Sequence, residues 1–172
     1  LKKFGRGVMI YATNGVWYLA GPEGGFTATN YSLGLVHNAG CVSAHSVVVA
    51  EAVQYYWSVE GIYQIALNEY GKPVATSVVE QSIQSHYNII PKATKDKSTG
   101  ADNRIKKQVE WFYPNVAQDV ATDYKHACNS SLLLDTRTGG MWPQSYNTTV
   151  AELAGDFIVG PVNTNVQTED ND

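Results

Sequence analysis

Short apolar runs, separated by polar and glycine residues, follow one another through the first part of the chain, the pattern of short β-strands joined by turns. Residues 8–12 and 16–20 are two such runs, and Thr13, Asn14 and Gly15 stand between them. An Asn-Gly pair between apolar runs is the strongest short-range signal for a β-hairpin, because a type I′ turn needs positive φ at both central positions. The sequence therefore predicts a hairpin here.

The same pattern continues beyond residue 46. Glu60 and Gly61 supply turn residues between two apolar runs, and a further turn is expected at residues 70–73. We predict strands as far as about residue 76, at residues 47–50, 53–58 and 62–66.

The period of the apolar positions changes at Ser77. From there they lie three or four residues apart, as on one face of a helix, at Val79, Ile83, Tyr87 and Ile90. Ser77 and Glu80 fit a capping box, in which each side chain satisfies a free amide at the helix start, and Pro91 ends the run. The sequence predicts one helix, about residues 78–89, inserted among the strands.

Residues 92–108 are charged, small and poor in apolar side chains, so we expect an exposed loop. Strand patterns resume afterwards, at residues 108–114, 131–135, 141–146 and 155–162. Pro143 marks an edge or a bulge in the third of these runs. Residues 163–172 are acidic and poor in apolar side chains, and we expect a tail or linker there.

One short motif occurs three times, as a turn glycine followed by an aliphatic residue or Met and then an aromatic residue. The copies are NGVWYL, EGIYQI and GGMWPQ, with glycines at Gly15, Gly61 and Gly140. The first interval is 46 residues, and the second is 79, nearly two periods if the helix and its loop are inserted. A period of about 40 to 50 residues built from short strands is typical of a β-propeller, whose blades are small antiparallel sheets. The regular turns would also suit a sandwich or a barrel.

We therefore predict a mainly β chain, a partial β-propeller of short antiparallel blades with one inserted helix, over residues 1–162. A propeller closes with about four to eight blades and this chain supplies about three or four, so the others are expected in further sequence or in a larger assembly. Tryptophans near the turns are expected to be wedges between sheets, with stacking on sugars or bases as the alternative. The predicted turn and packing residues are Gly15, Trp17, Trp57, Gly61, Tyr63, Trp111, Asp135, Gly140 and Trp142.

Composition narrows the functional classes. The 172 residues are 44% hydrophobic and 16% charged, enough apolar content for one core, and 11 Tyr and 4 Trp favour strands. The net charge of −4 and the absence of a basic stripe argue against sequence-specific nucleic-acid binding. No apolar run approaches the roughly 20 residues that cross a bilayer. The chain starts with neither an initiator Met nor a signal sequence, so we expect a fragment or a processed product.

The sequence contains no residue spacing that is typical of a metal or cofactor site. The four histidines lack the short, regular spacing of a zinc site. Residues 96–102 loosely follow a calcium loop but lack the distal Glu that closes coordination. Cys41 and Cys128 either form a disulfide or remain two buried thiols. We expect no metal and no cofactor.

Asp135 belongs to a tight turn that ends in Gly139 and Gly140. We expect its carboxylate to accept bonds from backbone amides two or three residues later, while one of the glycines adopts the left-handed conformation. The alternative is catalytic, since glycoside hydrolysis uses two carboxyl groups roughly 5 to 10 Å apart. The candidates for such a pair are Glu51, Glu60, Glu110 and Asp135.

The order of the elements resembles a known family. The segments YYWSVEGIYQI, SVVEQSIQSHYNIIP, KKQVEWFYP and NSSLLLDTRTGGMWPQSY resemble the propeller-bearing tail tube or nozzle proteins of tailed bacteriophages. In that family a strand with Trp and a turn, a helix ending in Ile-Pro and a hairpin with Asp-Thr-Arg-Thr-Gly follow in this order. The likeness covers about residues 47–146.

The resemblance implies a non-enzymatic structural subunit of a phage virion, assembled in the host cytoplasm. Its partners would be other copies of itself in a ring and neighbouring tail or portal-adaptor proteins. DNA would pass through transiently, without sequence-specific binding and without any membrane span. A carbohydrate-binding or glycoside-hydrolysing propeller is the alternative function.

Overall fold

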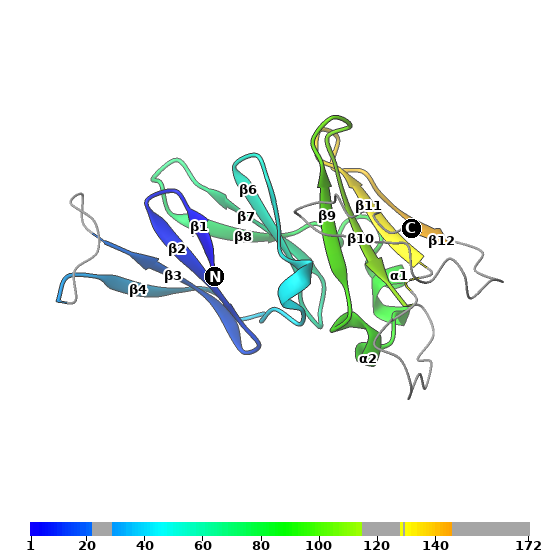
Figure 1. Ribbon diagram of the computed structural model, residues 1–172, viewed down its shortest axis with the longest axis horizontal. Helices are drawn as coiled ribbons and strands as arrows, with labels where there is room; N and C mark the ends of the chain where they lie inside the picture. The colour runs from blue at the N-terminus through cyan, green and yellow to red at the C-terminus, as the bar shows by residue number, and fades with distance from the viewer. Residues whose placement is uncertain (22–28, 115–127, 129, 146–172) are drawn as a thin grey trace, which may run out of the picture.

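The computed structural model describes residues 1–21, 29–114, 128 and 130–145 of the chain. In these ranges the chain forms three four-stranded antiparallel sheets in sequence order (Figure 1). Within each sheet every strand pairs with its neighbours in the chain. The predicted mainly β fold is confirmed, and the described residues form no closed barrel. We call the three layers sheet 1, sheet 2 and sheet 3.

Sheet 1 consists of β1 (Lys2–Phe4), β2 (Gly7–Ala12), β3 (Gly15–Ala20) and β4 (Ser32–His37). The predicted hairpin forms, but Ala12 pairs with Gly15, so the two turn residues are Thr13 and Asn14. Neither of them has positive φ, and the predicted type I′ turn centred on Asn-Gly is therefore wrong. Gly15 instead starts the strand, with a φ of 153° that side chains rarely adopt.

Sheet 2 consists of β5 (Val48–Ala50), β6 (Val53–Trp57), β7 (Ile62–Leu67) and β8 (Pro73–Ser77), preceded by a short 3₁₀ turn, η1 (Ala44–Ser46). It is the middle layer of the three (Figure 1). All residues of β6 from Gln54 to Trp57 are buried, because this strand has a packed layer on each face. Continuous burial replaces the alternation expected of a half-exposed strand.

Two short helices connect sheet 2 to sheet 3, α1 (Gln84–Ile89) and α2 (Lys92–Lys95). The predicted helix over residues 78–89 is too long. Ser77 Oγ does accept a bond from the Glu80 amide at 3.2 Å, but the bonds that follow form turns back to Val79 rather than a regular helix. The predicted apolar face is confirmed, since Val79, Tyr87 and Ile90 are buried and Ile83 packs against them.

Sheet 3 consists of β9 (Thr99–Asn103), β10 (Gln108–Tyr113), β11 (Ser130–Asp135) and β12 (Met141–Ser145). The exposed loop predicted for residues 92–108 is wrong, because this segment contains α2 and β9. Gly100 makes the close approach possible: a Cβ there would lie 2.3 Å from Val48 Cγ2. Lys95 is only 4% exposed, and its Nζ donates to the Val59 carbonyl at 3.0 Å. The strand and tail predicted for residues 155–172 lie outside the described residues.

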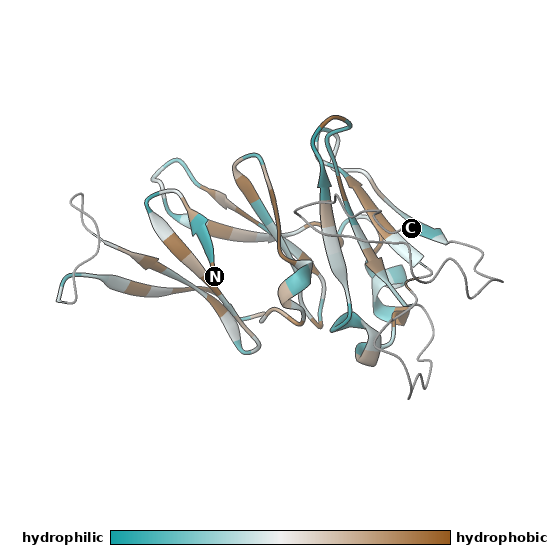
Figure 2. Cartoon of the chain, in the orientation of Figure 1, coloured by the Kyte–Doolittle hydropathy of each residue, from teal (hydrophilic) through white to brown (hydrophobic). Residues whose placement is uncertain are grey.

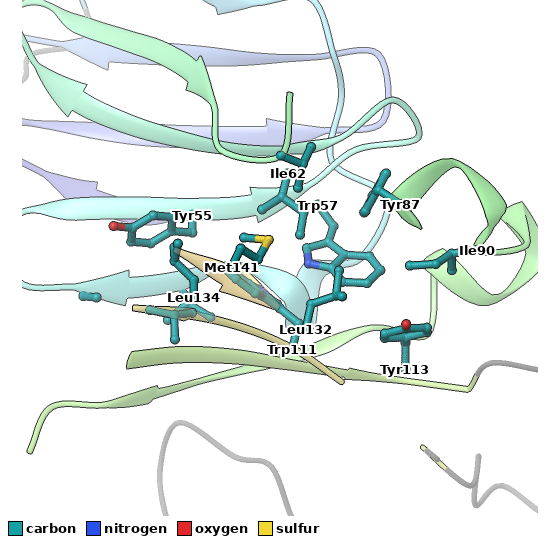
Figure 3. Packing of buried hydrophobic residues seen from close by; sticks show 14 residues of the cluster. Tyr55, Trp57, Ile62, Tyr87, Ile90, Trp111, Tyr113, Leu132, Leu134 and Met141 are labelled. Atoms are coloured by element: carbon teal, nitrogen blue, oxygen red, sulfur yellow. The ribbon is translucent and has the colours of Figure 1, made fainter. Parts of the chain in front are cut away.

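Two hydrophobic clusters lie on the two faces of sheet 2. The larger one fills the space between sheets 2 and 3 and includes Trp57, Trp111, Leu132 and Met141 (Figure 3). The smaller one lies between sheets 1 and 2 and is made of Phe4, Met9, Val16, Cys41, Val47, Tyr56 and Ile65. No helix of the described part of the chain is long and apolar enough to cross a membrane.

Candidate functional site

The three motif glycines do not occupy equivalent places. Gly15 begins the third strand of sheet 1 and Gly61 directly precedes the third strand of sheet 2, so these two positions match. Gly140 lies between the third and fourth strands of sheet 3, which is the opposite end of the meander. The 79 residues from Gly61 to Gly140 therefore lead from sheet 2 to sheet 3 and include the two helices between them. They do not correspond to two propeller periods.

Gly61 is needed for packing rather than for a left-handed turn. Its φ is not positive, but a Cβ there would lie 3.1 Å from Val79 Cγ2 in the connection after β8. Tyr63, two residues later, stacks on Tyr56 with ring centroids 5.6 Å apart. Tyr63 also lies against the His37 ring of β4, with ring centroids 4.4 Å apart, so both predicted residues pack sheet 2 against its surroundings.

The four tryptophans divide into two pairs. Trp57 and Trp111 are fully buried between sheets 2 and 3, and Trp111 Nε1 donates to the Ser46 carbonyl at 2.9 Å (Figure 3). Trp142 is 40% exposed and Trp17 is half-buried. The wedge role predicted for all four therefore fits the first pair, since the exposed Trp142 is not enclosed between sheets.

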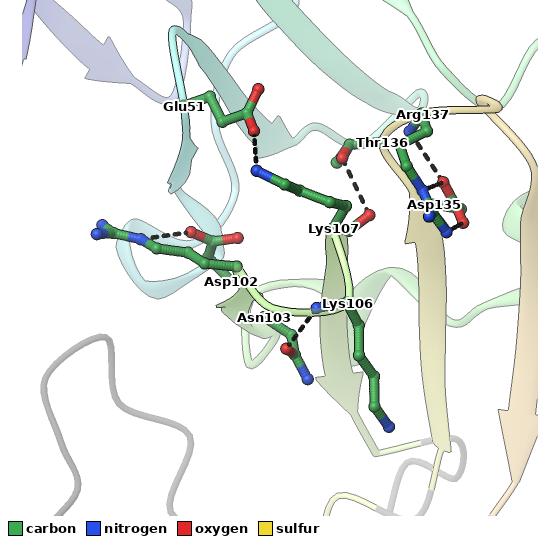
Figure 4. Close-up of polar contacts among 9 residues, drawn as sticks. Glu51, Asp102, Asn103, Lys106, Lys107, Asp135, Thr136 and Arg137 are labelled. Atoms are coloured by element: carbon green, nitrogen blue, oxygen red, sulfur yellow. Dashed lines mark hydrogen bonds and ion pairs between the residues drawn. The ribbon is translucent and has the colours of Figure 1, made fainter.

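A group of ion pairs gathers where turns of sheets 2 and 3 meet. We call it the turn cluster, and it consists of Glu51, Asp102, Arg104, Lys107, Asp135 and Arg137 (Figure 4). Asp135 Oδ1 accepts the backbone amides of Arg137 at 2.9 Å and Thr138 at 3.3 Å, as the turn sequence predicts. Gly139 adopts the left-handed conformation, with a φ of 71°.

Asp135 also forms an ion pair with Arg137, whose Nη2 lies 2.8 Å from Asp135 Oδ2. The hydrogen bonds from the Arg137 side chain and amide lower the pKa of Asp135 to about 2. This carboxylate is therefore ionised at neutral pH and stabilises its own turn.

Glu51 and Lys107 form the second notable pair of the cluster. Among the described residues they are the two non-glycine positions with left-handed backbone, at φ values of 56° and 58°. Their side chains form an ion pair across the gap between the β5–β6 turn and the start of β10 (Figure 4). The hydrogen bond from Lys107 lowers the pKa of Glu51. Such backbone conformations cost about 1–2 kcal/mol each, so the contact holds two strained turns together.

The turn cluster has balanced charge, with three cations and three carboxylates that pair one to one. A pocket of about 260 Å³ adjoins it, lined by Glu51, Asp102, Arg104, Lys107 and Thr136 among others. Phosphate-binding sites present an excess of positive charge. This pocket suits polar neutral groups or a neighbouring loop better than a phosphate.

Arg104 and Lys107 could not be recognised as site residues from the sequence, because a segment of scattered charges is usually a solvated loop. The available signal was the turn sequence NRIKKQ between strand-like runs.

Two of the four glycosidase candidates, Glu51 and Asp135, lie in the turn cluster. A general acid needs a pKa raised towards neutrality, but the pKa values of Glu51 and Asp135 are both lowered. Glu110 accepts a bond from Ser131 Oγ at 2.6 Å on sheet 3, while Glu60 lines a separate pocket beside Tyr63.

A second groove involves the first strand of every sheet. It has a volume of about 370 Å³ and is lined by Lys2 of β1, Val48 and Val49 of β5, and Gly100 and Asp102 of β9, among others. At the other edge of the layers, β4 contacts β8. The first strands of the three sheets therefore lie near one another. The fourth strand of sheet 1 likewise lies near the fourth strand of sheet 2.

Histidines and cysteines form no ligand set in the described residues, where no three metal-binding side chains come together. His37 Nδ1 lies 3.0 Å from the Tyr56 hydroxyl, inside the packing between sheets 1 and 2. Cys41 and Cys128 are free thiols. Burial raises the pKa of the Cys41 thiol, which donates to the Ser43 carbonyl at 3.1 Å.

Comparison with known proteins gives no relative: no family model and no curated protein matches the chain.

Proposed function

We propose that this chain is a non-enzymatic structural subunit of a phage virion tail, of the tail tube or nozzle type, and that its three sheets are blades of a β-propeller. The observation that supports the blade arrangement best is the groove bordered by β1, β5 and β9. In a propeller the first strand of each blade lines the central axis, and neighbouring blades pack face to face.

The packing of the layers supports the same arrangement. Each sheet is a four-stranded meander, and the two hydrophobic clusters fill the spaces between successive sheets. Contacts between β5 and β9 at one edge and between β4 and β8 at the other suit blades that radiate from an axis. Three sheets fall short of the roughly four needed for closure, so a closed propeller needs sheets in addition to these three.

The chemistry of the described surface favours a structural role over an enzymatic one. The cations of the turn cluster are paired with carboxylates, and the net charge of the chain is −4. A conduit for DNA gains nothing from tight phosphate binding, because bound phosphates would slow the genome. Other copies of the chain and neighbouring tail or portal-adaptor proteins are the proposed partners, within a virion assembled in the host cytoplasm.

Electron microscopy of the purified chain in negative stain, combined with mass measurement in solution, tests this proposal. We expect ring-shaped oligomers. A stable monomer that joins no ring, alone or with other tail proteins, would count against it.

A carbohydrate-binding propeller remains the second candidate, because of one groove between sheets 2 and 3. It measures about 400 Å³ and is lined by Tyr55, Gln64, Gln81 and Asp135 among others, a mixture of aromatic and amide groups that sugars bind. Glycan-array binding that is lost in Gln64→Ala would support this function. An absence of binding across a broad glycan panel would contradict the carbohydrate-binding function.

A further inference from the structure

A cavity of about 570 Å³ opens where the end of β4 in sheet 1 meets β7 and β8 of sheet 2, and we call it the β4–β8 cavity. Its volume is typical of small-ligand sites. The cavity lies between two sheets that already pack on each other, so a further sheet added to the stack would not fill it. The side chains that give it its chemistry are His37, Glu60, Tyr63, Ala75, Glu80 and Gln84.

The charge of the β4–β8 cavity is negative and uncompensated. Glu60 and Glu80 line it, and neither Lys nor Arg does. Within the described ranges, neither of the two carboxylates forms an ion pair, unlike the carboxylates of the turn cluster. Burial, followed by the charges of Glu60 and Glu80, raises the pKa of Tyr63, so both carboxylates act on the same hydroxyl.

His37 contributes a hydrogen-bond acceptor, because its donor is already used. The Tyr56 hydroxyl donates its proton to the Ala39 carbonyl at 3.0 Å. The oxygen of this hydroxyl can therefore only accept a bond from His37 Nδ1, which lies 3.0 Å away. In the neutral ring Nδ1 then carries the proton, and Nε2 is left as an acceptor.

Gln84 is in the same situation. Its Nε2 donates to the Glu60 carbonyl at 2.9 Å and to Asn88 Oδ1 at 2.8 Å. Both amide hydrogens are thereby used, and Oε1 is the atom that can still accept a bond. An imidazole nitrogen, an amide oxygen and two carboxylates thus combine acceptors with negative charge. The matching ligand is a cation with several N–H donors.

We propose that the β4–β8 cavity binds the guanidinium group of an arginine side chain from a protein partner. A guanidinium is always charged and carries several N–H donors in one plane, which suits acceptors that come from different elements. The Tyr63 ring and the Ala75 methyl group offer apolar surface on which the methylene stem of an arginine can pack. The inference goes beyond the virion role, because it rests on the lining of this cavity alone.

Methyl NMR on the full chain tests the site, because the Ala75 methyl group lines the cavity and methyl signals remain visible in large assemblies. With N-acetyl-arginine methylamide at low ionic strength, we expect a saturable shift of this signal and a Kd on the order of 1 mM. N-acetyl-citrulline methylamide has nearly the same shape without the charge and should bind about tenfold more weakly. Equal binding of the two, or no saturable shift up to roughly 50 mM, would overturn the proposal.

Two further probes test the kind of cation. N-acetyl-lysine methylamide lacks the planar group of donors, and methylguanidinium lacks the stem, so both should bind more weakly than the arginine probe. A lysine probe that binds as tightly would overturn the choice of a guanidinium. Methylguanidinium that binds as tightly would overturn the assignment to an arginine side chain.

Variants of the two glutamates test which groups carry the binding. Glu80→Gln should weaken binding of the arginine probe about three- to tenfold, and adding Glu60→Gln should weaken it further. Both side chains are exposed, so the melting temperature should not change. The matched control is Glu69→Gln, in the hydrophilic turn at the other end of the β7–β8 hairpin (Figure 2), which should bind like the unaltered chain. A double variant that binds like the unaltered chain would overturn the proposal.

Discussion

The two interfaces of sheet 2 are built from alternate residues of one strand but by different means. Towards sheet 3, Tyr55 and Trp57 of β6 enter an apolar cluster with Trp111, Leu132 and Met141. Towards sheet 1, Gln54 and Tyr56 enter a hydrogen-bonded layer. Gln54 Nε2 donates to the Lys3 carbonyl at 2.7 Å, and the Tyr56 hydroxyl donates to the Ala39 carbonyl at 3.0 Å.

The two interfaces therefore differ in what they contribute: one mainly buries apolar surface, and the other mainly orients sheet 1. The centre of the interface between sheets 2 and 3 is apolar and obtains its strength from burial, and a few bonds, such as the one from Trp111 Nε1 to the Ser46 carbonyl, add direction. The layer between sheets 1 and 2 is more polar, and Tyr11 donates to Gln54 Oε1 at 2.6 Å. Burial raises the pKa values of Tyr11 and Tyr56, which keeps both hydroxyls protonated as donors. Directional bonds of this kind fix how sheet 1 is oriented on sheet 2.

The largest expected effect is truncation in the apolar interface. Trp111→Ala should lower the free energy of unfolding by about 3–5 kcal/mol, because it removes a buried indole and leaves a cavity. Trp142→Ala is the matched control on the same sheet, and its exposed side chain should cost less than about 1 kcal/mol. Urea denaturation measures both. Equal losses from the two variants would contradict the assignment of the core.

The next effect is the loss of a polar partner in the hydrogen-bonded layer. Gln54→Leu should cost about 1–3 kcal/mol, because the Lys3 carbonyl and the Tyr11 hydroxyl lose their partner. Adding Tyr11→Phe should recover part of the loss, since the hydroxyl is then gone as well. If the two changes destabilise the chain additively in thermal melts, Tyr11 and Gln54 are not coupled as described.

A smaller difference distinguishes the two buried tryptophans. Trp111 Nε1 has an acceptor in Ser46, whereas Trp57 Nε1 is buried without a partner among the described residues. Trp111→Phe should therefore be more destabilising than Trp57→Phe by about 1 kcal/mol, the value of one hydrogen bond at matched loss of volume. Urea titrations of the two variants give the difference directly. The reverse order would show that packing alone decides the cost.

The smallest effect concerns the turn cluster beside the apolar interface. The pKa of Asp135 is lowered to about 2 in the folded chain, below the ordinary value of about 3.9 for an unfolded Asp. Its contribution is complete above about pH 4 and disappears as the pH falls towards 2, because protonation then favours the unfolded chain. Asp135→Asn should flatten the fall in stability across this range. Unchanged pH dependence, measured by urea midpoints, would mean that the ion pair with Arg137 contributes nothing.

Local patterns predicted much of the fold. The hairpin around Asn14, the strands of sheet 2 and the apolar face of the connecting segment follow from periodicity and turn residues. The exact turn could not be predicted in this way. Ala12 pairs with Gly15, and this pairing depends on the register of β2 and β3, which is set by packing in the core. The helix is shorter than predicted because the connection after Ser77 forms turns that pack Val79 against Gly61.

The features that could not be predicted from the sequence depend on contacts between residues far apart in the chain. β9 contains Thr99, Gly100 and Asp102, residues that indicate a loop, yet it pairs with β10 because Gly100 lets the strand approach Val48 and Trp111. Gly140 matches Gly15 by motif and not by place in its sheet. The ion pair of Glu51 with Lys107 joins residues far apart in sequence, so no local pattern could predict it.

A cryo-electron microscopy map of the assembled chain tests the radial arrangement of the three sheets most directly. We expect β1, β5 and β9 beside the axis of a closed ring of sheets, with β4, β8 and β12 at its rim. An assembly in which the edges formed by β1, β5 and β9 face outward, or in which the sheets form an open stack without an axis, would contradict the propeller arrangement.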